Sequence, residues 1–263
     1  MAHGIPTLET RDWDFKNDVR VYGRLSGNNN KYFLEEFFSQ KPALNGDMVV
    51  DADANDAAAL VAYTIANRHF EVLGTNGTSA STAFSSTVAG VTITTAGADN
   101  DQVIILPHLD TAQTAWTGIK WGTENQTEWE CAIRTSSSIA TQLIWAGLKL
   151  TNTPTIATDA DQVLFRYSTD DSDTNWQIID SVGGTDTQTD SGIAVAVSTN
   201  IRFRIKILST RQAQFYINDI LIYTSGALTN DVDLIPYVGI QALDTAAVSL
   251  TLSYEKISRI LFE

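Results

Sequence analysis

Apolar and polar residues alternate in a series of short runs that begins at Phe70 and continues to the C-terminus. The clearest run is Ile201–Leu208, in which isoleucine and phenylalanine alternate with arginine and lysine. A period of two places the apolar residues on one face of a β-strand. Roughly a dozen such runs, separated by turn residues, predict an antiparallel β-sandwich. No helical segments separate the runs, which argues against a parallel α/β sheet.

The expected strands are short and end at glycine, proline or polar turn residues. They are Phe70–Leu73, Val91–Thr95, Gln102–Leu106, Thr127–Thr135, Gln142–Leu150, Val163–Ser168, Trp176–Ser181, Ile193–Val197, Ile201–Leu208, Ala213–Ile217, Ile220–Tyr223, Tyr237–Ala242 and Val248–Tyr254.

Residues 1–67 lack this series and are expected to form an N-terminal arm with a helical segment, ahead of a sandwich domain at 68–263. In the stretch KYFLEEFFSQK (31–41), four apolar residues at i, i+1, i+4 and i+5 predict one face of a helix that stops at Pro42. These residues are Phe33, Leu34, Phe37 and Phe38. A second segment, Asp56–Ala66, fits either a helix or a buried strand over Leu60–Ile65.

The first 30 residues are irregular but carry apolar side chains such as Trp13 and Phe15. This is too apolar for a solvated tail. We therefore expect an interface with a partner chain or with the sandwich, formed by these two residues and the four on the predicted helical face.

Composition excludes several classes of protein. The chain has 17 Lys and Arg against 31 Asp and Glu, a net charge of −14, which argues against nucleic-acid binding because phosphate contacts need basic side chains. No apolar stretch approaches ~18 residues, so no membrane-spanning helix is expected. The N-terminus lacks the basic and apolar regions of a signal peptide. The single cysteine, Cys131, lies on the apolar face of its strand and is expected to be a small buried residue.

The segment NIRFRIKILSTRQAQFYINDILIYTSG (200–226) resembles a hairpin pair of concanavalin A-like (laminin G-like) jelly rolls, with Asp219 where that family often has glycine. An Asn-Asp turn can still form through the left-handed region. The order of the other strands, from Phe70–Leu73 to the closing segment Val248–Ile257, is similar to that family over roughly residues 68–263. The resemblance implies an all-β, antiparallel jelly-roll sandwich, a fold that serves lectins, hydrolases and virion parts.

Hydrolases of that family carry paired carboxylates in a pattern such as E-x-D-x-x-E, because one group protonates the leaving oxygen while the other attacks or activates water. The nearest feature is Glu124, Glu128 and Glu130 in ENQTEWE, which lacks the Asp and has the wrong spacing. The three histidines lie far apart. These observations predict that the chain is not an enzyme.

Two Asp-rich loops begin like calcium-binding loops, at Asp51–Asp56 and at Asp171–Asn175. Both lack the glycine and the final glutamate that an EF-hand loop needs. They are interpreted as polar turns, with a lectin-type calcium site as the alternative, and no metal or cofactor is predicted.

Two features are candidates for binding. Trp116 and Trp121 flank a Gly-containing loop and could form an exposed platform for a glycan, or pack at a strand end, while Trp129 belongs to an apolar strand face. Arg202, Arg204 and Lys206 form a basic ladder on one strand face. Such a ladder needs acidic residues opposite, either in the same sheet or on a neighbouring subunit onto which it docks electrostatically.

The irregular arm, the Thr-, Asn-, Ser- and Ala-rich jelly roll and the few lysines also resemble structural proteins of tailed-phage virions. This resemblance implies a virion surface protein, with capsid decoration (cement) as the first hypothesis. The alternative is a carbohydrate-binding tail- or head-fibre module that binds a host glycan. The expected partners are other virion proteins, above all the major capsid protein, and copies of the chain in a homo-trimer.

Overall fold

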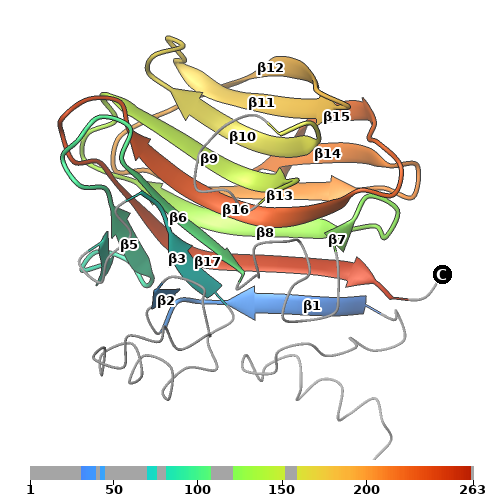
Figure 1. Ribbon diagram of the computed structural model, residues 1–263, viewed down its shortest axis with the longest axis horizontal. Coiled ribbons are helices and arrows are strands. Elements are labelled where there is room, and N and C mark those ends of the chain that lie inside the picture. Colours follow the sequence, from blue (N-terminus) through green and yellow to red (C-terminus); the bar gives the residue numbers. More distant parts are fainter. Residues whose placement is uncertain are drawn as a thin grey trace, which may run out of the picture.

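The computed structural model describes residues 31–39, 42–44, 70–75, 81–107, 121–151 and 159–261. These residues form two β-sheets that pack face to face as a jelly-roll sandwich (Figure 1). All strand pairs are antiparallel except β2 with β3. Within the described ranges, no helix is long and apolar enough to span a membrane.

Sheet A has the order β15-β14-β13-β8-β17-β5-β4, and β1 also pairs with β17. Its strands are β1 (Lys31–Glu36), β4 (Thr82–Phe84), β5 (Val91–Thr94), β8 (Glu128–Thr135), β13 (Asn200–Ile207), β14 (Gln212–Ile217), β15 (Ile220–Ala227) and β17 (Ser249–Ile260).

Sheet B has the order β12-β11-β10-β9-β16-β6-β3-β2, and β7 also pairs with β16. Its strands are β2 (Ala43–Leu44), β3 (Phe70–Leu73), β6 (Gln102–Pro107), β7 (Trp121–Gly122), β9 (Gln142–Lys149), β10 (Gln162–Ser168), β11 (Asn175–Val182), β12 (Thr185–Ala194) and β16 (Asp233–Ala242).

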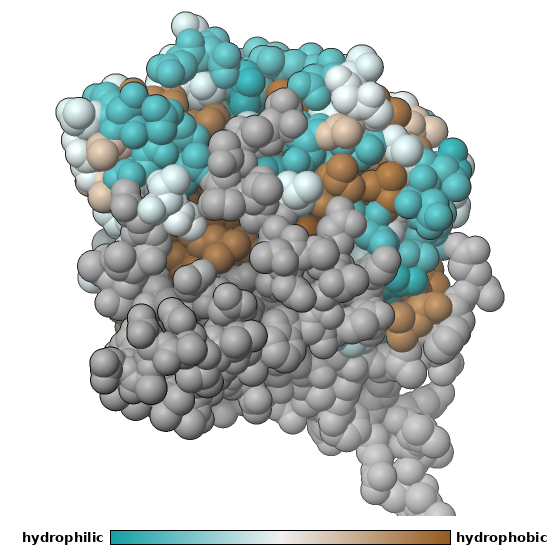
Figure 2. Space-filling view, in the orientation of Figure 1, coloured by the Kyte–Doolittle hydropathy of each residue, from teal (hydrophilic) through white to brown (hydrophobic). Residues whose placement is uncertain are grey.

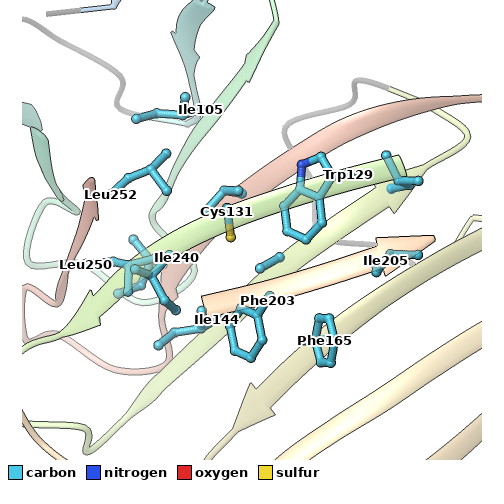
Figure 3. Packing of buried hydrophobic residues seen from close by; sticks show 14 of the residues in the cluster. Ile105, Trp129, Cys131, Ile144, Phe165, Phe203, Ile205, Ile240, Leu250 and Leu252 are labelled. Carbon is cyan, nitrogen blue, oxygen red and sulfur yellow. The ribbon is translucent and has the colours of Figure 1, made fainter. Parts of the chain in front are cut away.

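Aromatic contacts between the sheets form the centre of the core (Figure 3). The ring of Phe165 on β10 stacks on that of Phe203 on β13, with the centroids 4.4 Å apart. Trp176 on β11 meets Phe203 edge-on at 4.8 Å. Trp129 and Cys131 on β8 are fully buried in this core, as their position on the apolar face predicts.

The helix predicted over residues 31–41 is wrong, because Lys31–Glu36 is strand β1 and pairs along its whole length with β17. Pairing with a sheet edge outweighs the helical spacing of the apolar residues. Leu34 and Phe38 enter the core, whereas Phe37 remains 42% exposed and stacks on Tyr254. Strands β1 and β2 also show that part of the segment assigned to the N-terminal arm joins the sandwich.

Most of the predicted strands are confirmed within a few residues of their ends. The exception is Ile193–Val197, because β12 spans Thr185–Ala194. This edge strand is mostly exposed and polar, so it lacks the apolar alternation that would reveal it. The segment Asp56–Ala66 lies outside the described residues.

The turn between β14 and β15 confirms the expectation for the Asn-Asp pair. Asn218 and Asp219 have φ angles of 49° and 67°, which are left-handed. Two successive left-handed residues fit a tight hairpin turn, in which asparagine and aspartate are tolerated in place of glycine.

An unexpected carboxyl group lies inside the core. A register shift between Leu252 and Tyr254 turns Glu255 toward the interior, where it is 0% exposed and opposite Cys131. The indole nitrogen of Trp129 donates a hydrogen bond of 2.9 Å to Oε1 of Glu255. Burial raises the pKa of Glu255 to about 8, although this hydrogen bond acts in the opposite direction.

This carboxyl should make folding stability depend on pH. Between its ordinary pKa of 4.5 and the folded value of about 8, the folded state holds a proton that the unfolded state has lost. The free energy of unfolding therefore falls as pH rises through this window, by about 1.4 kcal/mol per pH unit. We predict that Glu255→Gln, which keeps the acceptor for Trp129, removes several kcal/mol of this loss in urea unfolding at pH 5, 7 and 8.5.

The variant Glu35→Gln, at an outward-facing position of β1, controls for the change in net charge. A difference between wild type and Glu255→Gln that stays constant from pH 5 to 8.5 would contradict the assignment.

Candidate functional site

The two sheets differ in how they bury their outer faces. In β8 and β13 of sheet A, only every second residue is buried, so the outer face is partly solvated. In β9 and β16 of sheet B, almost every residue is buried. Sheet B therefore carries a second buried surface on the side that faces away from sheet A.

We call this surface the sheet B outer face. Strand register assigns to it residues from seven strands, β3, β6, β9, β10, β11, β12 and β16. Its apolar members form a cluster separate from the main core and are Leu73, Ile104, Leu106, Leu143, Trp145, Leu164, Ile179, Ile235 and Tyr237. In Figure 2, hydrophobic residues lie beside hydrophilic ones, and the upper part of the view is mainly hydrophilic.

Lys149 is the central charged residue of this face, and its side chain is 0% exposed. Its Nζ atom lies 4.4 Å from the ring centroid of Tyr237, 5.5 Å from that of Trp145 and 3.8 Å from Oδ2 of Asp159. Asp159 also accepts hydrogen bonds from the backbone nitrogen and hydroxyl of Thr151. Burial lowers the pKa of Lys149, whereas the charge of Asp159 acts to raise it.

Several polar atoms on this face are buried without a hydrogen-bond partner in the described part of the chain. They are Nε1 of Trp145, the hydroxyl of Tyr237, and Oε1 of both Gln102 and Gln162. Leaving one such group unsatisfied costs about 1–3 kcal/mol. The set combines two donors with two acceptors.

Gly239 provides the space that the Tyr237 ring occupies. A Cβ atom at Gly239 would lie 3.2 Å from Cε1 of Tyr237 and 3.1 Å from Cγ1 of Ile104. Gly147, directly opposite Tyr237 on β9, is packed against Leu164. Both glycines therefore help to fix the rings on this face.

Arg166 on β10 organises the neighbouring polar part of the face. Its guanidinium forms ion pairs with Asp171 at 3.1 Å and with Asp173 at 3.3 Å, and donates to Gln188. Burial raises the pKa of Asp173, and the charge of Arg166 acts in the opposite direction. The Asp171–Asn175 loop is thus a polar turn tied to Arg166, and the described residues contain no group of three or more potential metal ligands.

The predicted glycan platform is wrong for Trp121, which is only 3% exposed and packs against Tyr32 with ring centroids 5.8 Å apart. Trp116 lies outside the described residues. Of the predicted interface residues, Leu34 and Phe38 are buried in the core of their own sandwich and cannot contact a partner. Phe33 and Phe37 remain on the outer side of sheet A, and Trp13 and Phe15 lie outside the described residues.

The basic ladder has acidic partners within its own sheet. Arg202 pairs with Glu130 at 3.8 Å and with Asp219 across the hairpin, and Arg204 lies 3.6 Å from Glu128. Burial would raise the pKa of Glu128, but the hydrogen bond from Lys31 and the nearby basic charges lower it. Lys206 lies opposite Glu128 in register but forms no ion pair among the described residues, and docking of the ladder onto an acidic partner stays a prediction.

Sequence reasoning missed the sheet B outer face, although a signal was present. Strands buried on both faces read as nearly continuous apolar runs rather than alternating ones. The segments QVIILP, QLIWAGLK and DLIPYVGIQA have this character, in contrast to NIRFRIKI. Within these segments, Lys149 and Gln102 mark polar positions of the face. Gly239 marks the place where the Tyr237 ring packs closely.

No protein-family model matches the sequence, and no curated protein is similar to it in sequence. Among solved structures, a protein of unknown function from Shewanella oneidensis MR-1 has a TM-score of 0.61 and 12% identity, covering 100% of this chain and 99% of that one. A family 7 alginate lyase, A1-II′, has a TM-score of 0.52 and 13% identity over 69% of this chain and 84% of the lyase. These likenesses confirm the concanavalin A-like jelly-roll fold.

The same finding corrects the prediction that the chain is not an enzyme. That prediction rested on the missing carboxylate pair of hydrolases, but the fold is shared with polysaccharide lyases. The absence of that pair therefore does not exclude catalysis. Neither of these two structures is described as a phage or capsid protein, so they do not support a virion role.

The basic ladder yields a test of its internal pairing. Arg204 lies 4.0 Å from the ring centroid of Tyr216 in addition to its contact with Glu128. Partly exposed ion pairs and cation–π contacts each contribute about 0.5–1 kcal/mol. We predict that Arg204→Ala lowers the free energy of unfolding by roughly 1 kcal/mol, and by less in 1 M NaCl, because salt screens the ion pair.

Lys206→Ala is the matched control, since no ion pair involves Lys206 among the described residues. Equal losses for the two variants in urea unfolding would contradict this account of the ladder.

Proposed function

We propose that the protein recognises a polysaccharide on the sheet B outer face. The observation that carries the proposal is a pair of aromatic side chains, Trp145 and Tyr237, whose buried polar atoms have no partner among the described residues. The same face holds two buried glutamine oxygens, of Gln102 and Gln162, that also lack a partner there. Native proteins rarely leave such groups unsatisfied without a functional reason. A bound ligand that supplies the missing partners provides that reason.

A carbohydrate fits this set because each sugar hydroxyl both donates and accepts hydrogen bonds. The hydroxyl oxygens can accept from the Trp145 indole and the Tyr237 hydroxyl, and their hydrogens can bond to Oε1 of Gln162. The apolar faces of sugar rings can pack on the aromatic side chains. These side chains are nearly fully covered by the protein itself in the absence of a ligand, so this face must open before a glycan can reach them.

The fold likeness to an alginate lyase supports a carbohydrate ligand. We further propose that the protein acts at the surface of a virion, as its composition and N-terminal arm predict. Its preferred role is a carbohydrate-binding tail- or head-fibre module, and capsid decoration is the alternative. The decoration hypothesis relied on an apolar helical face, and two of its four residues are in the core instead. A host glycan is then the partner, and a homo-trimer is the expected assembly.

A pair of tyrosine variants tests the site. Tyr237→Phe removes a hydroxyl that has no partner in the described part of the chain, so stability should not fall. If that hydroxyl binds a glycan, the affinity should fall about 5- to 13-fold, since a hydrogen bond contributes about 1–1.5 kcal/mol. Binding is measured by calorimetry on a panel of oligosaccharides, and the same mixtures are examined for shortened products.

Tyr167→Phe is the matched control and should behave in the opposite way. The Tyr167 hydroxyl donates to the carbonyl of Ile139 at 3.1 Å on the core side of sheet B. Its removal should lower stability by about 1 kcal/mol and leave glycan affinity unchanged. Unchanged affinity of Tyr237→Phe for every glycan that the wild type binds would contradict the proposed site.

A further inference from the structure

The charges of the sheet B outer face are unevenly balanced. Within the described residues, its cations are Lys149 and Arg166, and each already has a carboxylate partner. The carboxylates on or beside the face are Asp159, Asp171, Asp173, Asp186 and Asp190. Among the charged residues that the structure describes on this face, two cations against five carboxylates give a net charge of −3.

The carboxylates are held in place by the fold. Asp173 accepts a hydrogen bond from the backbone nitrogen of Ser168, Asp190 accepts from Asn175, and Asp186 accepts from Ser181. Asp159 is fixed by Thr151. Their negative potential therefore belongs to the site itself and adds to the net charge of −14 of the whole chain.

We infer that the ligand of the sheet B outer face is a neutral glycan rather than a uronate polymer such as alginate. This inference rests on the proposed polysaccharide site. A carboxylate on the sugar would have to displace Asp159 from Lys149, or Asp171 and Asp173 from Arg166, and would then face their charges. Like charges brought together in this way oppose binding and select against the wrong partner.

Hydroxyl groups can satisfy all four unpartnered atoms, because each hydroxyl both donates and accepts hydrogen bonds. A uronate ring also carries hydroxyls, so the charge of the face, and not this set of atoms, selects against it. Substrate class is therefore not transferable from the alginate lyase that shares the fold.

The test uses the full chain and matched probes. Alginate oligosaccharides are compared with the same oligosaccharides after reduction of their carboxyl groups, together with neutral hexasaccharides of glucose, mannose and xylose. We expect at least one neutral probe to bind, with an affinity at least 10-fold above that of any uronate probe at 20 mM NaCl. The difference should shrink at 300 mM NaCl, because salt screens the repulsion.

Charge variants identify the cause. Asp190→Asn, on this face, should raise the ratio of uronate affinity to neutral glycan affinity about 2- to 5-fold at 20 mM NaCl. Glu130→Gln removes one charge from the outer side of sheet A and should leave this ratio unchanged. Uronate binding as tight as neutral binding would overturn the inference alone, whereas failure of every probe to bind would overturn the proposed polysaccharide site as well.

Discussion

Burial of both faces of sheet B is the constraint on which the rest of the molecule depends. Sheet A can alternate buried and solvated residues because its outer face carries ion pairs such as Arg204–Glu128. Strands β9 and β16 cannot alternate, because both of their faces are removed from water. Polar groups on the second face must therefore find partners within the protein or in a ligand. Lys149 has found Asp159, whereas the Trp145 indole and the Tyr237 hydroxyl have no partner in the described part of the chain.

The fold was largely predictable because alternation is a local property. Ile201–Leu208 reads as a strand from its own residues, and β13 spans Asn200–Ile207. Predictions failed where long-range contacts decide the outcome. The spacing of Phe33, Leu34, Phe37 and Phe38 fits a helix, but pairing with β17 makes residues 31–36 a strand. The edge strand β12 has no buried face to read.

The candidate site was harder to predict than the fold, since it joins residues from strands far apart in the sequence. Trp145, Gln162 and Tyr237 share one face of sheet B only because β9 lies between β10 and β16. Trp121, which looked exposed in a glycine-containing loop, is instead buried against Tyr32. Glu255 was also missed, although the change of apolar phase between Leu252 and Ile257 marks the bulge that turns it inward. In both sheets, the residues that interrupt the regular apolar pattern of a strand are the ones that indicate a special site.

The most direct test of the central claim follows the indole N–H signals of the six tryptophans by ¹⁵N–¹H NMR while a bound oligosaccharide is added. The Trp145→Phe and Trp129→Phe variants assign two of these signals. The account predicts that the Trp145 signal shifts on saturation, because its N–H gains a partner, while the Trp129 signal stays in place, because its N–H already donates to Glu255 in the core. Binding that leaves the Trp145 signal unmoved would show that the glycan lies elsewhere and would contradict the account.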